Sequence, residues 1–195
     1  MEQQELSTRD SLQLIESMIN KAQNRFSENG HLYLLWGWVV LICSITSFVT
    51  IYFYGSGKMI MYVWMLTIPT VIYQMIYLAR VKKKTAVRTY TDEINSYVWL
   101  VFIIMGFLVG IIVGRSGQPQ LFNPLVLMLY GMPTFLSGVI LKFKPLRIGA
   151  ICCWVLALVS VLIPYQFSFL LLALAVITTW IVPGYLLRSR FKTQH

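Results

Sequence analysis

The sequence predicts an all-α fold: a polytopic membrane helix bundle with six transmembrane helices and a cytoplasmic amphipathic helix before them. Composition is the first reason, because 57% of the 195 residues are hydrophobic and only 12% are charged, against about 25% charged in a typical soluble domain. The second reason is six apolar runs, most of them near the length of about 20 residues that spans a bilayer. The third is that basic residues gather on one side of these runs.

Residues 1–30 predict the cytoplasmic amphipathic helix. Ser7 or Thr8 can begin a helix, and Asn29-Gly30 is a typical helix end. Apolar residues recur between them at spacings of three and four, which places them on one helix face: Leu12, Ile15, Ile19, Ala22 and Phe26. Acidic and basic residues are balanced here, whereas a membrane-surface helix is usually rich in Lys and Arg. This face is therefore expected to dock on the protein's own bundle, a second copy or another protein, with lipid as the alternative.

Residues 31–188 form the predicted six-helix transmembrane domain, and residues 189–195 are a cytoplasmic tail. Each span must be helical, because lipid offers no partner for open backbone groups. The predicted spans are residues 32–53, 60–78, 97–113, 121–141, 148–162 and 167–187.

The Lys and Arg residues indicate the orientation of these spans. Of the 16 in the chain, only Lys58 and Arg115 fall on one side. The others lie in the N-terminal segment, the second and fourth connections and the C-terminal tail: Arg9, Lys21, Arg25, Arg80, Lys82, Lys83, Lys84, Arg88, Lys142, Lys144, Arg147, Arg188, Arg190 and Lys192. Because cytoplasmic loops collect basic residues, both termini are predicted to be cytoplasmic. The net charge of +9 then needs no nucleic-acid partner.

Glycines and prolines mark the expected packing positions. Gly106, Gly110 and Gly114 recur every four residues in the third span, and small residues at this spacing let another helix approach closely. They predict packing inside the bundle or at a dimer interface. Further small residues are expected at packing positions in the fourth and fifth spans: Gly131, Ser137, Gly138, Gly149, Ala150 and Ala157. Pro69, Pro133 and Pro183 interrupt the second, fourth and sixth spans, where kinks are expected.

A basic cluster follows the second span: Arg80, Lys82, Lys83, Lys84 and Arg88. Such a cluster next to a membrane helix attracts anionic lipid headgroups. Its alternative role is simply to fix the topology.

The spans themselves lack catalytic chemistry. No Asp, Glu, Lys or Arg falls within them as drawn, although proton relays, ion sites and voltage sensors depend on such residues. No catalytic, cofactor-binding or metal-binding residues are predicted. Cys43, Cys152 and Cys153 lie in apolar runs and are expected to pack rather than to form disulfides.

The predicted function is accordingly non-enzymatic. We expect an integral membrane protein whose unknown molecular activity, regulatory or structural, depends on protein–protein contacts, as a homodimer or with a partner bound through the N-terminal helix. The alternative is a channel or carrier for a neutral or apolar solute, because hydroxyl-bearing residues and prolines occur within the spans.

Five stretches along the chain form a distinctive set. They are Glu16-Ser17-Met18-Ile19 with Phe26 and Gly30, Leu34-Leu35-Trp36-Gly37-Trp38, Leu129-Tyr130-Gly131 with Phe135, Ser137 and Gly138, Lys142-Phe143-Lys144-Pro145-Leu146 with Gly149, and Pro183-Gly184-Tyr185-Leu186-Leu187-Arg188. In these stretches the chain resembles a family of small, uncharacterised six-span membrane proteins from Bacteroidota. The resemblance implies a multi-pass protein of the bacterial inner membrane and no activity.

Overall fold

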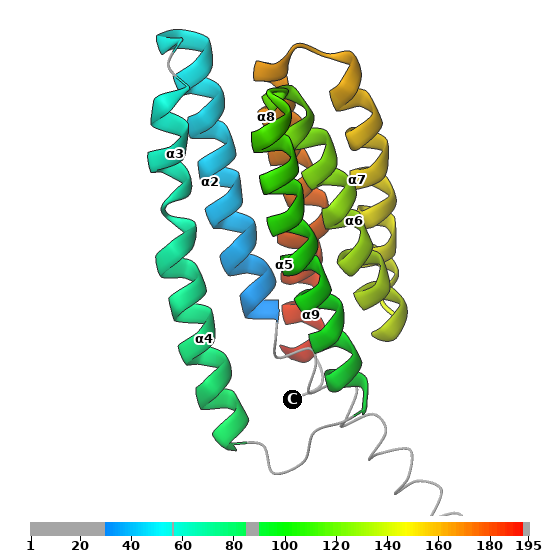
Figure 1. Ribbon diagram of the computed structural model, residues 1–195. Helices are drawn as coiled ribbons and strands as arrows, with labels where there is room; N and C mark the ends of the chain where they lie inside the picture. Colours follow the sequence, from blue (N-terminus) through cyan, green and yellow to red (C-terminus); the bar gives the residue numbers. More distant parts are fainter. Residues whose placement is uncertain (1–29, 56, 85–89, 193–195) are drawn as a thin grey trace, which may run out of the picture.

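The computed structural model describes residues 30–55, 57–84 and 90–192, and the secondary structure of this part is entirely helical (Figure 1). The predicted N-terminal amphipathic helix lies outside the described residues. In chain order the elements are α2 (Gly30–Tyr54), α3 (Lys58–Trp64), α4 (Thr67–Lys84), α5 (Tyr90–Ser116), the short 3₁₀ helix η1 (Pro119–Leu121), α6 (Phe122–Ile140), α7 (Lys144–Leu162), α8 (Tyr165–Val176), the π-helical turn η2 (Ile177–Ile181) and α9 (Val182–Lys192).

Six helical stretches of the described chain are long and apolar enough to cross a membrane, which confirms the predicted number. They run over Gly30–Tyr54, Met59–Arg80, Glu93–Ser116, Pro119–Ile140, Lys144–Leu162 and Tyr165–Ser189. Most extend a few residues beyond the predicted spans, since apolarity locates the middle of a helix better than its ends. The last helix continues to Lys192, past the predicted start of the tail.

The second stretch is broken into α3 and α4 at Met65 and Leu66. Pro69 has no N–H, so it cannot donate to the carbonyl of Met65 four residues earlier. The Ile68 N–H donates to that carbonyl instead, at 3.0 Å. The Thr67 hydroxyl also donates to the Trp64 carbonyl at 2.6 Å. The break predicted near Pro69 is therefore present, and its free carbonyls find nearby donors.

A second irregularity lies just before Pro183 in the last stretch. The Val182 N–H donates to the carbonyl of Ile177, five residues earlier, and this closes the π turn η2. Pro183 removes the donor that would continue the regular α-helical pattern. The predicted interruption at Pro183 thus takes the form of one wide turn between α8 and α9. Pro133, by contrast, lies inside α6, which is continuous from Phe122 to Ile140, so the interruption predicted there is not a break in the helix.

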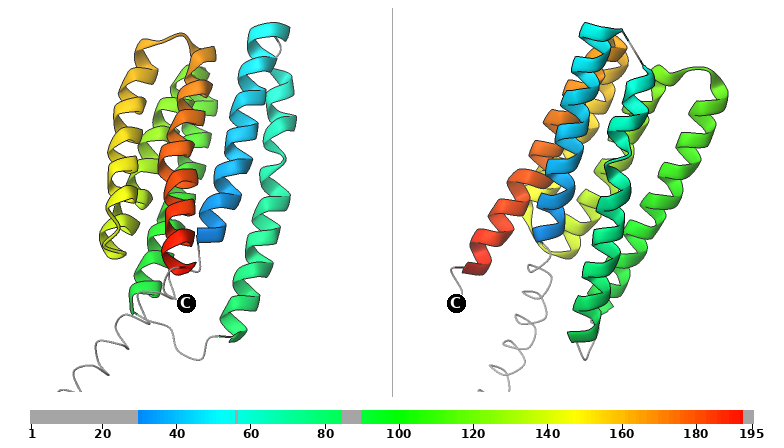
Figure 2. Two further views of the ribbon diagram at one scale, coloured as in Figure 1. Left: turned by 180° about the vertical axis from the view of Figure 1, so that it is seen from behind. Right: turned by 90° about the vertical axis from the view of Figure 1, so that its left-hand side faces the viewer.

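The helices form a packed centre with two more exposed flanks (Figures 1 and 2). α6 and α7 pair as an antiparallel hairpin, and α2 runs along α8, η2 and α9. On one flank α3 and α4 pack on α2, and on the other α5 packs on α6. The stretches on these two flanks are the least buried of the six. The buried core is therefore formed mainly by α2 and α6–α9.

The two ends of the bundle differ in charge. The start of α2, the end of α4, the start of α5, the α6–α7 turn and the end of α9 lie at one end (Figure 1). Arg80, Lys142 and Lys144 belong to segments at this end, whereas Arg115 ends α5 at the other. The fold thus separates the described basic residues as the sequence predicts.

Candidate functional site

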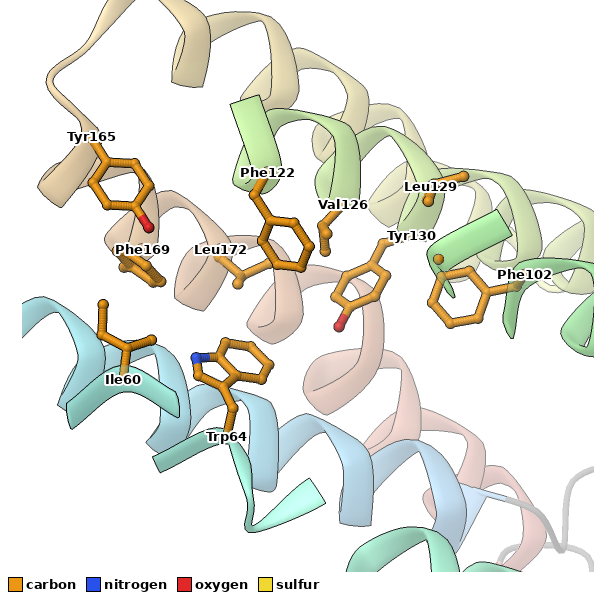
Figure 3. A pocket seen from close by; sticks show the side chains of 11 residues that line it. Ile60, Trp64, Phe102, Phe122, Val126, Leu129, Tyr130, Tyr165, Phe169 and Leu172 are labelled. Carbon is orange, nitrogen blue, oxygen red and sulfur yellow. The ribbon is translucent and has the colours of Figure 1, made fainter. Parts of the chain in front are cut away.

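A pocket with a volume of about 330 Å³ lies between α3, α5, α6 and α8 (Figure 3). It is in the half of the bundle that contains the α2–α3, α5–α6 and α7–α8 connections. Its lining is apolar and largely aromatic: Ile60, Trp64, Phe102, Gly106, Phe122, Val126, Leu129, Tyr130, Tyr165, Phe169 and Leu172. The side chains that line it are uncharged, and the Tyr130 and Tyr165 hydroxyls and the Trp64 indole N–H are their polar groups, so the pocket is suited to hold an apolar group.

Trp64 forms one wall of the pocket, and a hydrogen bond holds it in place. Its indole N–H donates to the Ser47 hydroxyl of α2 at 3.1 Å. Trp64 is the last residue of α3, directly before the break that separates α3 from α4. A side chain fixed by a hydrogen bond and by the helix break gives the wall a defined position before anything binds.

The opposite wall continues into an aromatic cluster, which we define as Tyr33, Trp99, Phe102, Tyr130 and Trp180. Tyr33, Tyr130 and Trp180 are buried, and Trp99 and Phe102 are half-buried. The ring centroids of Tyr130 and Trp180 are 4.8 Å apart, and those of Phe102 and Tyr130 are 5.4 Å apart. Trp99 lies 6.2 Å from both Tyr33 and Trp180. Aromatic pairs at these separations attract each other beyond their burial. The cluster joins α2, α5, α6 and η2. Phe102 and Tyr130 belong both to the cluster and to the pocket lining, so the cluster holds this wall of the pocket in place.

Polar side chains beside this cluster form hydrogen bonds with other residues of the bundle. The Ser137 hydroxyl of α6 donates to the Asn95 side-chain oxygen of α5 at 2.8 Å, with both residues buried. The Trp180 indole N–H donates to the Thr134 hydroxyl at 3.4 Å, and Thr134 donates to the Tyr130 carbonyl at 2.7 Å. These contacts fit the role of polar groups that hold membrane helices together.

The predicted glycine positions are placed on an open face of α5. A Cβ atom added to Gly106, Gly110 or Gly114 would meet no atom within 4 Å. These three therefore do not pack against another helix among the described residues, although Gly106 borders the pocket. Packing on a second chain stays a prediction.

Glycines of other helices make close contacts of this kind, and two of them, Gly138 and Gly149, lie at predicted packing positions. A Cβ atom on Gly37 would lie 2.7 Å from Ile181, and one on Gly149 would lie 2.6 Å from the Thr178 carbonyl oxygen. A Cβ atom on Gly138 would lie 2.9 Å from Leu146 and Arg147. The helix crossings of this fold depend on isolated glycines rather than on a repeated motif.

The remaining predicted sites are only partly described. Leu12, Ile15, Ile19, Ala22 and Phe26 all precede the described residues, as does the face they form. Arg80 is exposed near the end of α4, and Lys82, Lys83 and Lys84 form the end of that helix. Arg88 lies outside the described residues. Contact of this cluster with anionic lipid stays a prediction.

The cysteines are free thiols within the bundle, as the sequence predicts. Cys153 on α7 donates to the Leu127 carbonyl at 3.2 Å, and Cys43 on α2 to the Val63 carbonyl at 3.5 Å. Among the described residues no group of three or more His, Cys, Asp or Glu side chains is placed to hold a metal ion.

The pocket was not anticipated from the sequence. Its residues come from four elements, and which of their faces meet depends on how distant helices pack. The local signal at Trp64 and Tyr62 favours anchoring at a membrane interface, which is a different role. Comparison of the chain with family models, with curated proteins and with solved structures gave no match. The candidate site therefore stands on its geometry alone.

Proposed function

We propose that this chain is a multi-pass protein of the bacterial inner membrane with both termini in the cytoplasm. Six apolar helices of sufficient length support the membrane location. The orientation is supported by the end of the bundle that contains Arg80, Lys142, Lys144, Arg147 and Arg188. The resemblance to a Bacteroidota membrane family supports the inner membrane.

Within that membrane we infer a non-enzymatic protein that acts through protein–protein contacts, with the glycine face of α5 as its contact surface. We define this face as Gly106, Gly110 and Gly114. The observation that supports it most is a contrast: the glycines within α2, α6, α7 and α9 face neighbouring atoms at close range, whereas those of α5 face none in the part of the chain that the structure describes. Helices associate in lipid largely by close packing, and glycine permits the closest approach.

A second copy of the chain is the partner that the proposal names. The open face is on one of the two least buried stretches, so a second α5 can reach it without displacing a helix of the same chain. Two such faces would form a twofold contact in which each glycine row meets the other.

The test measures association of the full-length protein in liposomes by energy transfer between donor- and acceptor-labelled copies. We expect Gly110→Leu to weaken self-association by about tenfold, because a bulky side chain separates the helices by more than a methyl group would. Ile112→Phe adds bulk to another face of α5 and serves as the matched control. Equal association of wild type and Gly110→Leu, or a wild-type protein that stays monomeric at high protein density, would refute the contact.

A further inference from the structure

The chemistry of the pocket selects the kind of molecule that can fill it. Water needs two to four polar partners in a cavity, and apolar cavities that lack them stay dry or bind apolar molecules. The lining of this pocket is mainly carbon (Figure 3). Its polar side-chain groups are the Tyr130 and Tyr165 hydroxyls and the Trp64 indole N–H, which already donates to Ser47. A volume of about 330 Å³ lies within the range of small-molecule sites. Hydrocarbon therefore fits the pocket better than water does.

Two of the helices that line the pocket do not pack extensively on each other. α3 packs on α2, and α5 packs on α6. No extensive packed interface joins α3 to α5 in the described part of the chain. Both helices belong to the least buried of the six stretches, so in the proposed membrane location a lipid chain that enters between them comes directly from the bilayer.

The long axis of the pocket suits an amphiphile. Tyr165 is the first residue of α8 and lies near the end of the bundle, whereas Phe102 lies deeper along α5 (Figure 3). Tyrosine prefers the level of lipid headgroups, because its ring is apolar and its hydroxyl polar. A chain that extends from Tyr165 toward Phe102 would keep its polar end at the headgroup level.

We propose that this pocket binds one acyl chain of a bilayer phospholipid, which enters between α3 and α5 with its headgroup near Tyr165. The walls on both sides are fixed beforehand, by the Trp64–Ser47 hydrogen bond and by the contact between the tilted rings of Tyr130 and Trp180. The bound chain occupies the space that side chains leave open. The proposal rests on the proposed membrane location, and it shares one residue, Gly106, with the proposed contact face of α5.

The test uses the full-length protein in liposomes that contain a trace of phosphatidylethanolamine with a diazirine on one acyl chain. After illumination, mass spectrometry of the digested protein locates the adducts. We expect adducts on Trp64, Val126 and Leu172 at higher yield than on exposed residues outside the pocket. Val126→Trp fills the pocket, and its bulk should lower the yield at Trp64 and Leu172 by about tenfold.

Leu158→Trp is the matched control, because Leu158 is exposed on α7 away from the pocket, and its adducts in the pocket should equal those of wild type. Thermal unfolding checks both variants, and Val126→Phe replaces Val126→Trp if the latter does not fold. The proposal is overturned by equal yields inside and outside the pocket, by unchanged yields in the filled variant, or by crosslinks that place a second copy there. It is also overturned if a diazirine-labelled free fatty acid labels the pocket and the phospholipid does not. Energy transfer between copies is measured separately, so loss of lipid binding and loss of self-association are distinguishable.

Discussion

Single side-chain hydrogen bonds link helices that are far apart in the sequence. Trp36 on α2 donates to Gln74 on α4 at 2.6 Å, and the Asn123 amide on α6 donates to Ser168 on α8 at 2.6 Å. In an apolar environment, hydrophobic burial drives helix association less than in water, and polar pairs add specific attraction. Other hydroxyls bond within their own helix, as Ser160 does to the Ala157 carbonyl. The partner of each hydroxyl, rather than its burial alone, determines its effect on stability.

Ser168→Ala tests this difference. Asn123 and Ser168 are both buried, so the substitution leaves the Asn123 amide without its acceptor and should cost about 1 kcal/mol. For a chain of this length that corresponds to a fall of about 2–4 °C in the thermal unfolding midpoint. Ser160→Ala is the control, since the Ala157 carbonyl keeps its place in the helix. Equal midpoints for the two variants in detergent would show that the Asn123–Ser168 bond contributes nothing.

Two helical elements approach each other most closely where one of them has a glycine at the crossing. η2 approaches α7 so closely that a Cβ atom on Gly149 would lie 2.6 Å from the Thr178 carbonyl oxygen. The wide turn before Pro183 and the missing side chain at Gly149 therefore occur at the same crossing. By contrast, α5 presents three glycines to open space.

We expect opposite effects of the same substitution at these two places. Gly149→Ala puts a methyl group against backbone atoms that cannot rotate away, so it should lower the free energy of unfolding by about 1–3 kcal/mol. Gly110→Ala adds a methyl group in open space and improves helix propensity, so it should leave stability unchanged or raise it. Thermal unfolding in detergent, at dilutions where the protein is monomeric, compares the two. A Gly110→Ala variant as unstable as Gly149→Ala would mean that α5 is packed inside the bundle.

These elements also show what the sequence could predict. Six helices followed from run length and apolarity, and the break before Pro69 followed from the missing N–H. The glycine spacing in α5 predicted packing of some kind, but spacing cannot tell an inward face from an outward one. Gly149 was expected at a packing position, and its close contact with Thr178 agrees with that expectation. Gly37 has no glycine at four-residue spacing, so its contact with Ile181 could not be anticipated. The contact at each depends on a helix that lies far away in the chain.

At the scale of the molecule, the pocket and the orientation depend on different kinds of information. The pocket exists because particular faces of α3, α5, α6 and α8 are turned toward one another. No local sequence pattern predicts which faces these are. The orientation requires only that charge be unequal between the two ends. That inequality is visible in the sequence, and the fold preserves it by placing the α6–α7 turn at the same end of the bundle as the ends of α4 and α9 (Figure 1). The charge of this end predicts that it faces the cytoplasm.

Cysteine labelling of intact cells tests that prediction. With Cys43, Cys152 and Cys153 replaced, Gln118→Cys places a thiol in the exposed α5–α6 connection, and Lys144→Cys places one at the exposed start of α7. We expect a membrane-impermeant maleimide to label Gln118→Cys in cells whose outer membrane is permeabilised, and Lys144→Cys only after the inner membrane is also opened. The reason is that moving the basic end across the membrane is disfavoured, since short loops rich in Lys and Arg stay in the cytoplasm. The reverse labelling pattern would show that the orientation in the membrane is opposite to the predicted one, with the pocket in the cytoplasmic half of the bilayer. Labelling of both positions without opening the inner membrane would show that the two ends do not lie on opposite sides.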